Sequence, residues 1–138
     1  MSSALLAGSC LCGSVRFEVK PPFSAFRYCH CSRCQKASGS AHAANAFVSA
    51  AQFSWRAGDA QIKRYDHPAA QRFSVWFCEN CGSRVPHPVR GRDDYLIPAG
   101  LLDQPPADMA RPQNSIFWGS RAPWYVPPQE MPCLNEYT

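Results

Sequence analysis

Apolar and polar residues alternate with a period of two in several short stretches, a pattern typical of strands with one buried face. The clearest stretches are residues 15–19, 62–65 and 73–77. Further short strands are expected at residues 46–48, 53–55, 95–97 and 115–118. Only residues 32–37 have the composition of a helical turn. The pattern therefore predicts a mainly β fold of short strands with few helical turns.

The C-terminal part of the chain is rich in proline. Eight prolines follow one another at positions 98, 105, 106, 112, 123, 127, 128 and 132. Because proline has no backbone N–H, this part is expected to run over the surface, with one or two edge strands. We find no repeat or linker, so residues 1–138 are expected to form a single compact domain. With 46% hydrophobic and 12% aromatic residues, its core is modest.

Seven of the eight cysteines fall into three tight clusters that lie far apart in the sequence. They are Cys10-x-Cys12, Cys29-x-Cys31-x-x-Cys34 and Cys78-x-x-Cys81. Thiolates at such spacings can chelate one tetrahedral ion, and two pairs from separate parts of a chain can close a four-sulfur zinc site. Seven thiolates suffice for one closed site and for a second site with three protein ligands and an open position. Zinc bound in this way would help to staple a small core.

A disulfide framework is the alternative for an even number of cysteines in a short chain. Cysteines one or two residues apart are poorly placed to bridge each other. The N-terminal stretch also has no basic start and no apolar run of signal-peptide length. We therefore expect reduced thiols and a cytoplasmic location.

The spacing of the cysteines allows two ways of dividing them between two metal ions. Cys31-x-x-Cys34 could join Cys78-x-x-Cys81 as a zinc ribbon, but the 43 intervening residues exceed the usual spacing of about 15–20. The simpler pairing places Cys10, Cys12, Cys78 and Cys81 on a structural zinc and gives Cys29, Cys31 and Cys34 to the second ion. In that pairing Cys10 and Cys12 would face one side of an extended segment. Cys78–Cys81 would form a turn at a hairpin, with Gly82 in the left-handed region.

The cysteine motifs and their surroundings resemble one known family. Cys10-Leu-Cys12-Gly-Ser-Val15, Cys29-His-Cys31-Ser-Arg-Cys34-Gln-Lys-Ala-Ser38-Gly-Ser40 and Cys78-Glu-Asn-Cys81-Gly-Ser83 are similar to those of the glutathione-dependent formaldehyde-activating enzyme family, which includes centromere protein V. Gly100-Leu-Leu-Asp103 and Ile116-Phe-Trp118 extend the similarity into the C-terminal half. Many members have histidine where this chain has Ser115, so no role of that histidine is carried over.

The resemblance implies a β fold of the Rab-exchange-factor-like zinc type and the simpler division of the two metals. It also implies an activity, the joining of formaldehyde to the thiol of glutathione to give S-hydroxymethylglutathione, classed as carbon–sulfur lyase chemistry in reverse. The second site would then be catalytic, and its zinc would favour a small thiol as substrate. Arg33, Lys36, Ser38 and Ser40 are candidate partners for a carboxylate or hydroxyl of that substrate.

The remaining histidines, Cys133 and the tryptophans are not assigned to the metal sites. His30 lies between two ligands and is expected to point away from the metal, and His87 is expected in a surface loop. Cys133 is interpreted as a packed or free thiol. Most tryptophans are assigned to the core, with Trp118 and Trp124 the better pair to wall a pocket.

A second function class is a zinc-stapled binding module for protein or nucleic acid, with both metals structural. The net charge of +4 is spread along the chain, so it gives no argument for nucleic acid as a partner. A binding module would also be expected to complete its second site with a fourth ligand, and none stands at ribbon spacing. No stretch is apolar and long enough to span a membrane. The sequence fixes neither the oligomeric state nor the occupancy of the second zinc.

Overall fold

The computed structural model describes residues 4–106 and 108–137. Within them, short strands alternate with turns and one α-helix, α1 (Ser32–Ser38). The strands are β1 (Leu6–Ser9), β2 (Arg16–Val19), β3 (Ala25–Cys29), β4 (Ala43–Ser49), β5 (Phe53–Ala57), β6 (Ile62–Asp66), β7 (Ser74–Cys78), β8 (Arg84–Val85), β9 (His87–Pro88), β10 (Asp94–Pro98) and β11 (Asn114–Ile116). Single 3₁₀ turns are η1 (Ala50–Gln52), η2 (Asp59–Gln61), η3 (Ala99–Leu101), η4 (Trp118–Ser120) and η5 (Pro128–Glu130).

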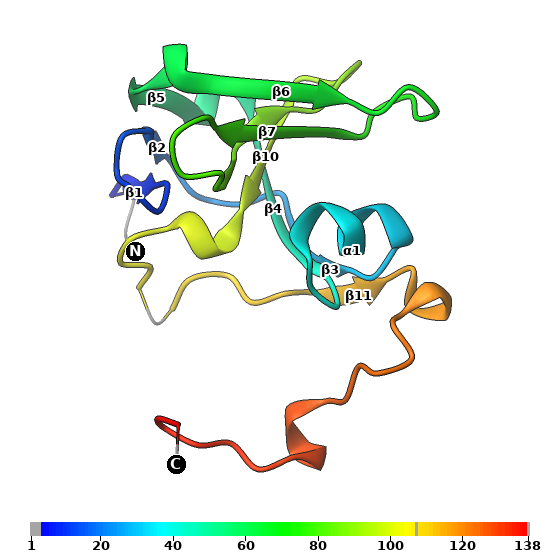
Figure 1. Cartoon of the computed structure of the whole chain (residues 1–138). Coiled ribbons are helices and arrows are strands. Elements are labelled where there is room, and N and C mark those ends of the chain that lie inside the picture. The colour runs from blue at the N-terminus through cyan, green and yellow to red at the C-terminus, as the bar shows by residue number, and fades with distance from the viewer. Residues whose placement is uncertain (1–3, 107, 138) are drawn as a thin grey trace.

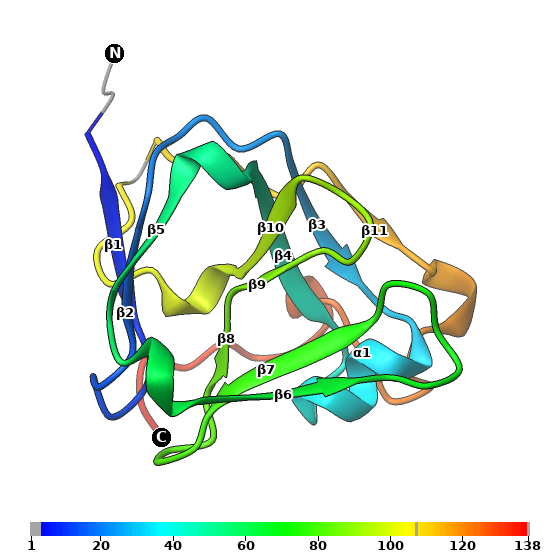
Figure 2. The ribbon, with the colours of Figure 1, turned by 90° about the horizontal axis from the view of Figure 1, so that it is seen from above.

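The strands form three sheets. The central sheet has the order β11-β3-β4-β10-β9, and it is antiparallel except for the edge strand β11, which runs parallel to β3. Two antiparallel sheets flank it, β1-β2-β5 and β6-β7-β8. Figures 1 and 2 show β1-β2-β5 at one end of the central strands and the β6–β7 hairpin beside α1.

The main core lies between the central sheet and the β1-β2-β5 sheet. It consists of Phe17, Val19, Phe26, Ala46, Val48, Ile97 and Leu102. Phe53 of β5 stacks on Phe17 and on Tyr95, with ring centroids 5.6 and 4.3 Å apart. Each large apolar side chain buried here stabilises the fold by about 2 kcal/mol.

The opposite face of the central sheet carries both polar and apolar residues. Successive side chains of a strand point to opposite faces, so Asn45 and Phe47 of β4 face away from the core residues Ala46 and Val48. The pairing register places Leu96 beside Phe47 and His87 beside Leu96 on this same face. This face of the central sheet, with its polar and apolar side chains, is the one turned toward α1 and the β6-β7-β8 sheet.

The prediction of a mainly β fold with few helical turns is confirmed. All seven expected strands occur, although residues 117 and 118 lie beyond the end of β11, and Trp118 begins η4. β1, β3, β8 and β9 were not predicted. The expectation that Cys10 and Cys12 lie on one extended segment is wrong, because β1 ends at Ser9 and the Gly13 amide donates to the Cys10 carbonyl, which closes a turn.

The proline-rich C-terminal part supplies the edge strand β11 and then continues as extended chain with 3₁₀ turns. In Figure 1 its last segment runs below the sheets, away from the rest of the molecule. Within the described residues, no helix is long and apolar enough to cross a membrane.

Candidate metal centres

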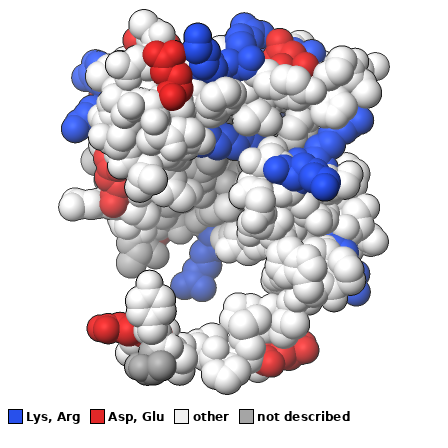
Figure 3. Space-filling view, viewed as in Figure 1, with Lys and Arg blue, Asp and Glu red and all other residues white. Residues whose placement is uncertain are grey.

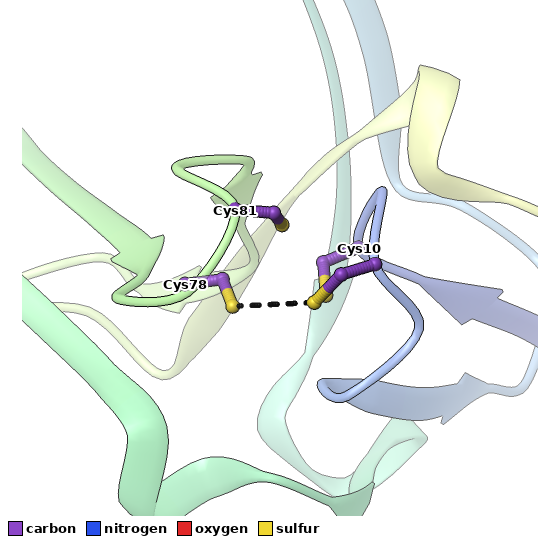
Figure 4. Close-up of side chains that lie close together, drawn as sticks. Cys10, Cys78 and Cys81 are labelled. Carbon is purple, nitrogen blue, oxygen red and sulfur yellow. Dashed lines mark hydrogen bonds between the residues drawn. The ribbon is translucent and has the colours of Figure 1, made fainter.

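The first centre, the four-cysteine group, consists of Cys10, Cys12, Cys78 and Cys81, whose sulfur atoms all lie within 4.8 Å of one another. A turn after β1 carries the first pair, and the end of β7 with the following turn carries the second. Figure 4 shows Cys10 facing Cys78 and Cys81 from the other side of a small gap. Cys12 Sγ lies 3.6 Å from Cys10 Sγ and 3.9 Å from Cys78 Sγ. Tetrahedral zinc with bonds of about 2.3 Å needs sulfurs about 3.8 Å apart, so the group fits such an ion.

Two glycines shape the turns that carry these ligands. Gly13 has φ 82° and Gly82 has φ 77°, both in the left-handed region where a side chain is strained. The Gly82 amide donates to the Cys78 carbonyl at 2.8 Å, so the chain reverses and brings Cys81 back beside Cys78. The Val15 amide also donates to Cys10 Sγ at 3.3 Å, which stabilises that sulfur as a thiolate.

Neighbouring hydroxyls make thiolates easier to form in this group. The hydrogen bond between Cys12 and Ser14 lowers the pKa of Cys12 to about 7, and that between Cys81 and Ser83 lowers the pKa of Cys81 to about 5. Burial acts in the other direction on Cys10, whose pKa is raised. A metal ion bound here would meet two thiols that ionise readily near neutral pH.

The second centre, the three-cysteine group, consists of Cys29, Cys31 and Cys34, again with sulfur atoms within 4.8 Å of one another. Cys29 ends β3, Cys31 is the N-cap of α1, and Cys34 lies in the first turn of the helix. Within the described residues, no further His, Cys, Asp or Glu joins these three. The group could hold a metal ion with one position left for another ligand.

The thiols of the second group influence one another. The hydrogen bond from Cys34, helped by the positive charge of Arg84, lowers the pKa of Cys29 to about 6. The pKa of Cys34 is raised, first by its hydrogen bond to Cys29 and then by burial. Arg84 is half-buried, and its positive charge interacts with all three cysteines.

The three-cysteine group forms part of the wall of a cavity of about 570 Å³. Four arginines also line it, namely Arg33, Arg72, Arg84 and Arg92, and among its described lining residues there is no Asp or Glu. Within the described part of the chain, Arg92 is the only one of these four with a carboxylate partner, Asp94, at 2.7 Å. Figure 3 shows basic side chains gathered over the region of α1. This arginine-lined cavity therefore suits an anionic ligand.

The four residues that the sequence suggested for substrate contact are spread over different surfaces. Arg33 lines the arginine-lined cavity and a neighbouring one, and Lys36 lines only the neighbour. Ser38 lines a third cavity, and its hydroxyl donates to the Cys34 carbonyl at 2.7 Å. Ser40 is exposed and lines none of these three cavities. Arg72, Arg84 and Arg92 were not predicted, because they lie far in sequence from Cys29, Cys31 and Cys34, whose cavity they line.

Two expectations about other residues are wrong or need revision. His87 is 2% exposed and lines the arginine-lined cavity, so it is no surface loop residue. Its strand β9 pairs with β10 and carries it to the inner face of the sheet. Trp118 and Trp124 are 44% and 66% exposed and line none of the three cavities.

His30 and Cys133 were also singled out by the sequence. His30 is fully buried, enclosed by the rings of His42, Trp118 and Tyr125. Cys133 is exposed and free, and the other seven cysteines are free thiols as well.

Comparisons with known proteins agree with this architecture. The family model described as "Glutathione-dependent formaldehyde-activating enzyme" matches residues 5–120. The crystal structure of a Rhodobacter sphaeroides protein, a structural genomics target, has a similar fold with a TM-score of 0.62 and 24% sequence identity. The alignment covers 80% of this chain and 99% of that chain. A search of curated proteins finds no match.

Proposed function

Because this chain belongs to the glutathione-dependent formaldehyde-activating enzyme family, we propose that it catalyses the reversible addition of a small thiol to formaldehyde, with glutathione as the first candidate. The addition forms one carbon–sulfur bond. The carbonyl oxygen of formaldehyde becomes a hydroxyl, and the thiol proton is transferred in net terms from sulfur to oxygen. The reverse reaction breaks the carbon–sulfur bond and is that of a carbon–sulfur lyase.

The observation that carries the proposal is the position of the three-cysteine group on the wall of the arginine-lined cavity. Cys29, Cys31 and Cys34 would hold a zinc ion there, and Cys10, Cys12, Cys78 and Cys81 would hold a structural one. Zinc at the open site would keep the sulfur of an incoming thiol deprotonated near neutral pH.

The arginines of the cavity supply the selectivity for an anion. Glutathione has two carboxylates, and Arg33 and Arg72 at exposed positions of the lining are suited to bind them by charge-assisted hydrogen bonds. Arg84 lies deeper, beside the cysteines, where it favours negative charge on sulfur or oxygen. The volume of about 570 Å³ lies within the range of small-molecule sites.

The alternative function, a binding module with two structural metals, requires a closed second site. The described residues offer no fourth protein ligand to Cys29, Cys31 and Cys34, and their cavity is concave and charged. Both observations favour the enzyme.

The test combines metal content with exchange kinetics. Protein purified without added metal would be analysed for zinc per chain, and exchange between glutathione and its formaldehyde adduct would be followed by NMR. We expect two zinc ions and exchange faster than in buffer. Arg72→Gln should weaken the binding of glutathione by about tenfold, whereas the matched change at exposed Arg111, outside the cavity, should leave it unchanged. Two zinc ions with exchange no faster than in buffer would contradict the proposal.

A further inference from the structure

Three residues that line the arginine-lined cavity each have a buried polar side-chain atom with no hydrogen-bond partner. The atoms are His87 Nε2, Asn45 Oδ1 and Arg84 Nε, out of six such side-chain atoms among the described residues. His87 is 2% exposed and Asn45 is 7% exposed. Leaving a buried polar atom unpaired costs about 1–3 kcal/mol. Three such atoms in residues that line one cavity indicate a site whose partner is a ligand.

The three residues reach the cavity from two different sheets. His87 and Asn45 belong to the central sheet, where the β9-β10-β4 pairing places both on the face opposite the core. Arg84 belongs to the facing β6-β7-β8 sheet, and only Val85 and Pro86 separate it from His87 along the chain. The positive charge of Arg84 interacts electrostatically with the three cysteines and with His87.

The protonation state of His87 is set by its surroundings. Its Nδ1 lies 3.0 Å from the Pro88 carbonyl oxygen, which can only accept, so Nδ1 carries the hydrogen and Nε2 presents a lone pair. Burial lowers the pKa of His87 to about 4. Among the charged groups around it, Arg84 and Arg90 favour the neutral ring and Asp66 opposes them. Near neutral pH, Nε2 is thus a proton acceptor.

We propose that His87 Nε2 is the group that takes the proton from the hydroxyl of the S-hydroxymethyl adduct, while Arg84 Nε–H donates a hydrogen bond to the same oxygen. This inference rests on the proposed function. In the direction of cleavage, the O–H proton passes to Nε2 and the C–O bond becomes the carbonyl of formaldehyde. The C–S bond breaks, and its electron pair stays on the sulfur of the thiolate that leaves.

In the direction of addition, the same groups act in reverse. The sulfur attacks the carbonyl carbon, Arg84 stabilises the negative charge that develops on oxygen, and protonated His87 returns the proton. Asn45 Oδ1 adds a second acceptor, which suits an amide N–H of a peptide thiol.

The kinetic test uses His87→Gln, with His67→Gln as the matched control, since His67 is half-buried and lines only the neighbouring cavity. Exchange of the glutathione adduct would be measured by NMR against pH, and the affinity for glutathione alone by calorimetry. We expect His87→Gln to slow exchange by about 10²-fold with little change in the affinity for glutathione, which has no hydroxymethyl group. An exchange rate for His87→Gln within about threefold of the wild-type rate would overturn the inference and leave the proposed function intact.

A second measurement uses wild-type protein, so it does not depend on the variant folding or on turnover. The ¹⁵N resonance of His87 Nε2 would be followed on addition of S-(2-hydroxyethyl)glutathione or S-ethylglutathione. We expect only the hydroxylated ligand to shift it, and equal shifts with both would overturn the inference. Wild-type protein that neither binds glutathione nor accelerates exchange would instead overturn the proposed function, and the role of His87 with it.

Discussion

The sulfur of Cys31 caps the helix that carries Cys34, with the Cys34 amide donating to Cys31 Sγ at 3.3 Å. Cys31 has extended backbone geometry, as an N-cap residue should, and its carbonyl accepts from the Gln35 amide at 3.0 Å. One thiol therefore starts α1 and also offers a metal ligand.

This double role can be separated by two substitutions. Serine at position 31 keeps a capping oxygen but is a much poorer zinc ligand, whereas alanine removes both functions. We expect Cys31→Ser and Cys31→Ala each to bind one zinc fewer than wild-type protein. Cys31→Ala should also lose about 1 kcal/mol of unfolding free energy relative to Cys31→Ser. Metal analysis and urea denaturation measure the two effects, and equal unfolding free energies would show that the cap contributes nothing.

The four-cysteine group should matter more for stability, because it ties the turn after β1 to the end of β7. Cys78 is fully buried among Cys10, Val15 and Val85. We expect Cys78→Ser to lower the unfolding free energy by several kcal/mol, about 3 or more, since a structural zinc contributes directly to folding. Cys133→Ser is the control, because Cys133 is exposed and lies outside both groups. A Cys78→Ser protein as stable as this control would refute a structural role.

Local pattern explains why much of this fold could be predicted. Alternation identified β6 and β7. The cysteine spacing left two pairings open, and the simpler of them matches the two groups of sulfur atoms in the structure. β3 escaped detection because its sequence, Ala-Phe-Arg-Tyr-Cys, has only a weak alternation, and its place in the sheet depends on pairing with β4. The turn at Cys10 was not predicted, because the spacing of two residues between Cys10 and Cys12 fits either a strand or a turn.

The rest of the candidate site depends on tertiary structure. Arg72 and Arg84 approach the cysteines only because the β6-β7-β8 sheet folds over the central one, and no local signal predicts such an approach. His87 stands between two prolines, a composition typical of loops, yet its two-residue strand is held by β10. Chain proximity to a motif was therefore a poor guide to which residues line the arginine-lined cavity, as Ser40 shows.

The buried His87 should make stability depend on pH. Its pKa is about 4 in the folded protein and about 6.5 in an unfolded chain, so the unfolded state binds more protons between these values. Stability is therefore complete above pH of about 6.5 and falls by about 3 kcal/mol as the pH drops toward 4. Urea denaturation at a series of pH values, compared with His87→Gln, measures this contribution. Acid also releases metal from both proteins, so the difference between the two curves is the relevant quantity, and parallel curves would exclude His87 as its source.

Phe117 offers a test of strain at the edge of the arginine-lined cavity. It is the one non-glycine residue with positive φ, 55°, in the described chain, and its side chain is 62% exposed. The next residue, Trp118, packs edge-on against His30, and the Ser120 carbonyl accepts from Gln35 at 3.0 Å, so contacts on the C-terminal side hold the turn in place. A left-handed conformation costs a residue with a Cβ atom about 1–2 kcal/mol, and glycine avoids that cost.

We therefore expect Phe117→Gly to be more stable than Phe117→Ala by about 1 kcal/mol, because both lose the ring and only glycine relieves the backbone. Thermal and urea denaturation of the pair isolate the strain, since any contribution of the ring is absent from both. The ring lines the cavity, so both variants should bind glutathione more weakly than wild-type protein, and to the same extent. Equal stabilities would mean that the turn is unstrained. Unaltered glutathione affinity in both would mean that the exposed ring has no contact with the bound thiol.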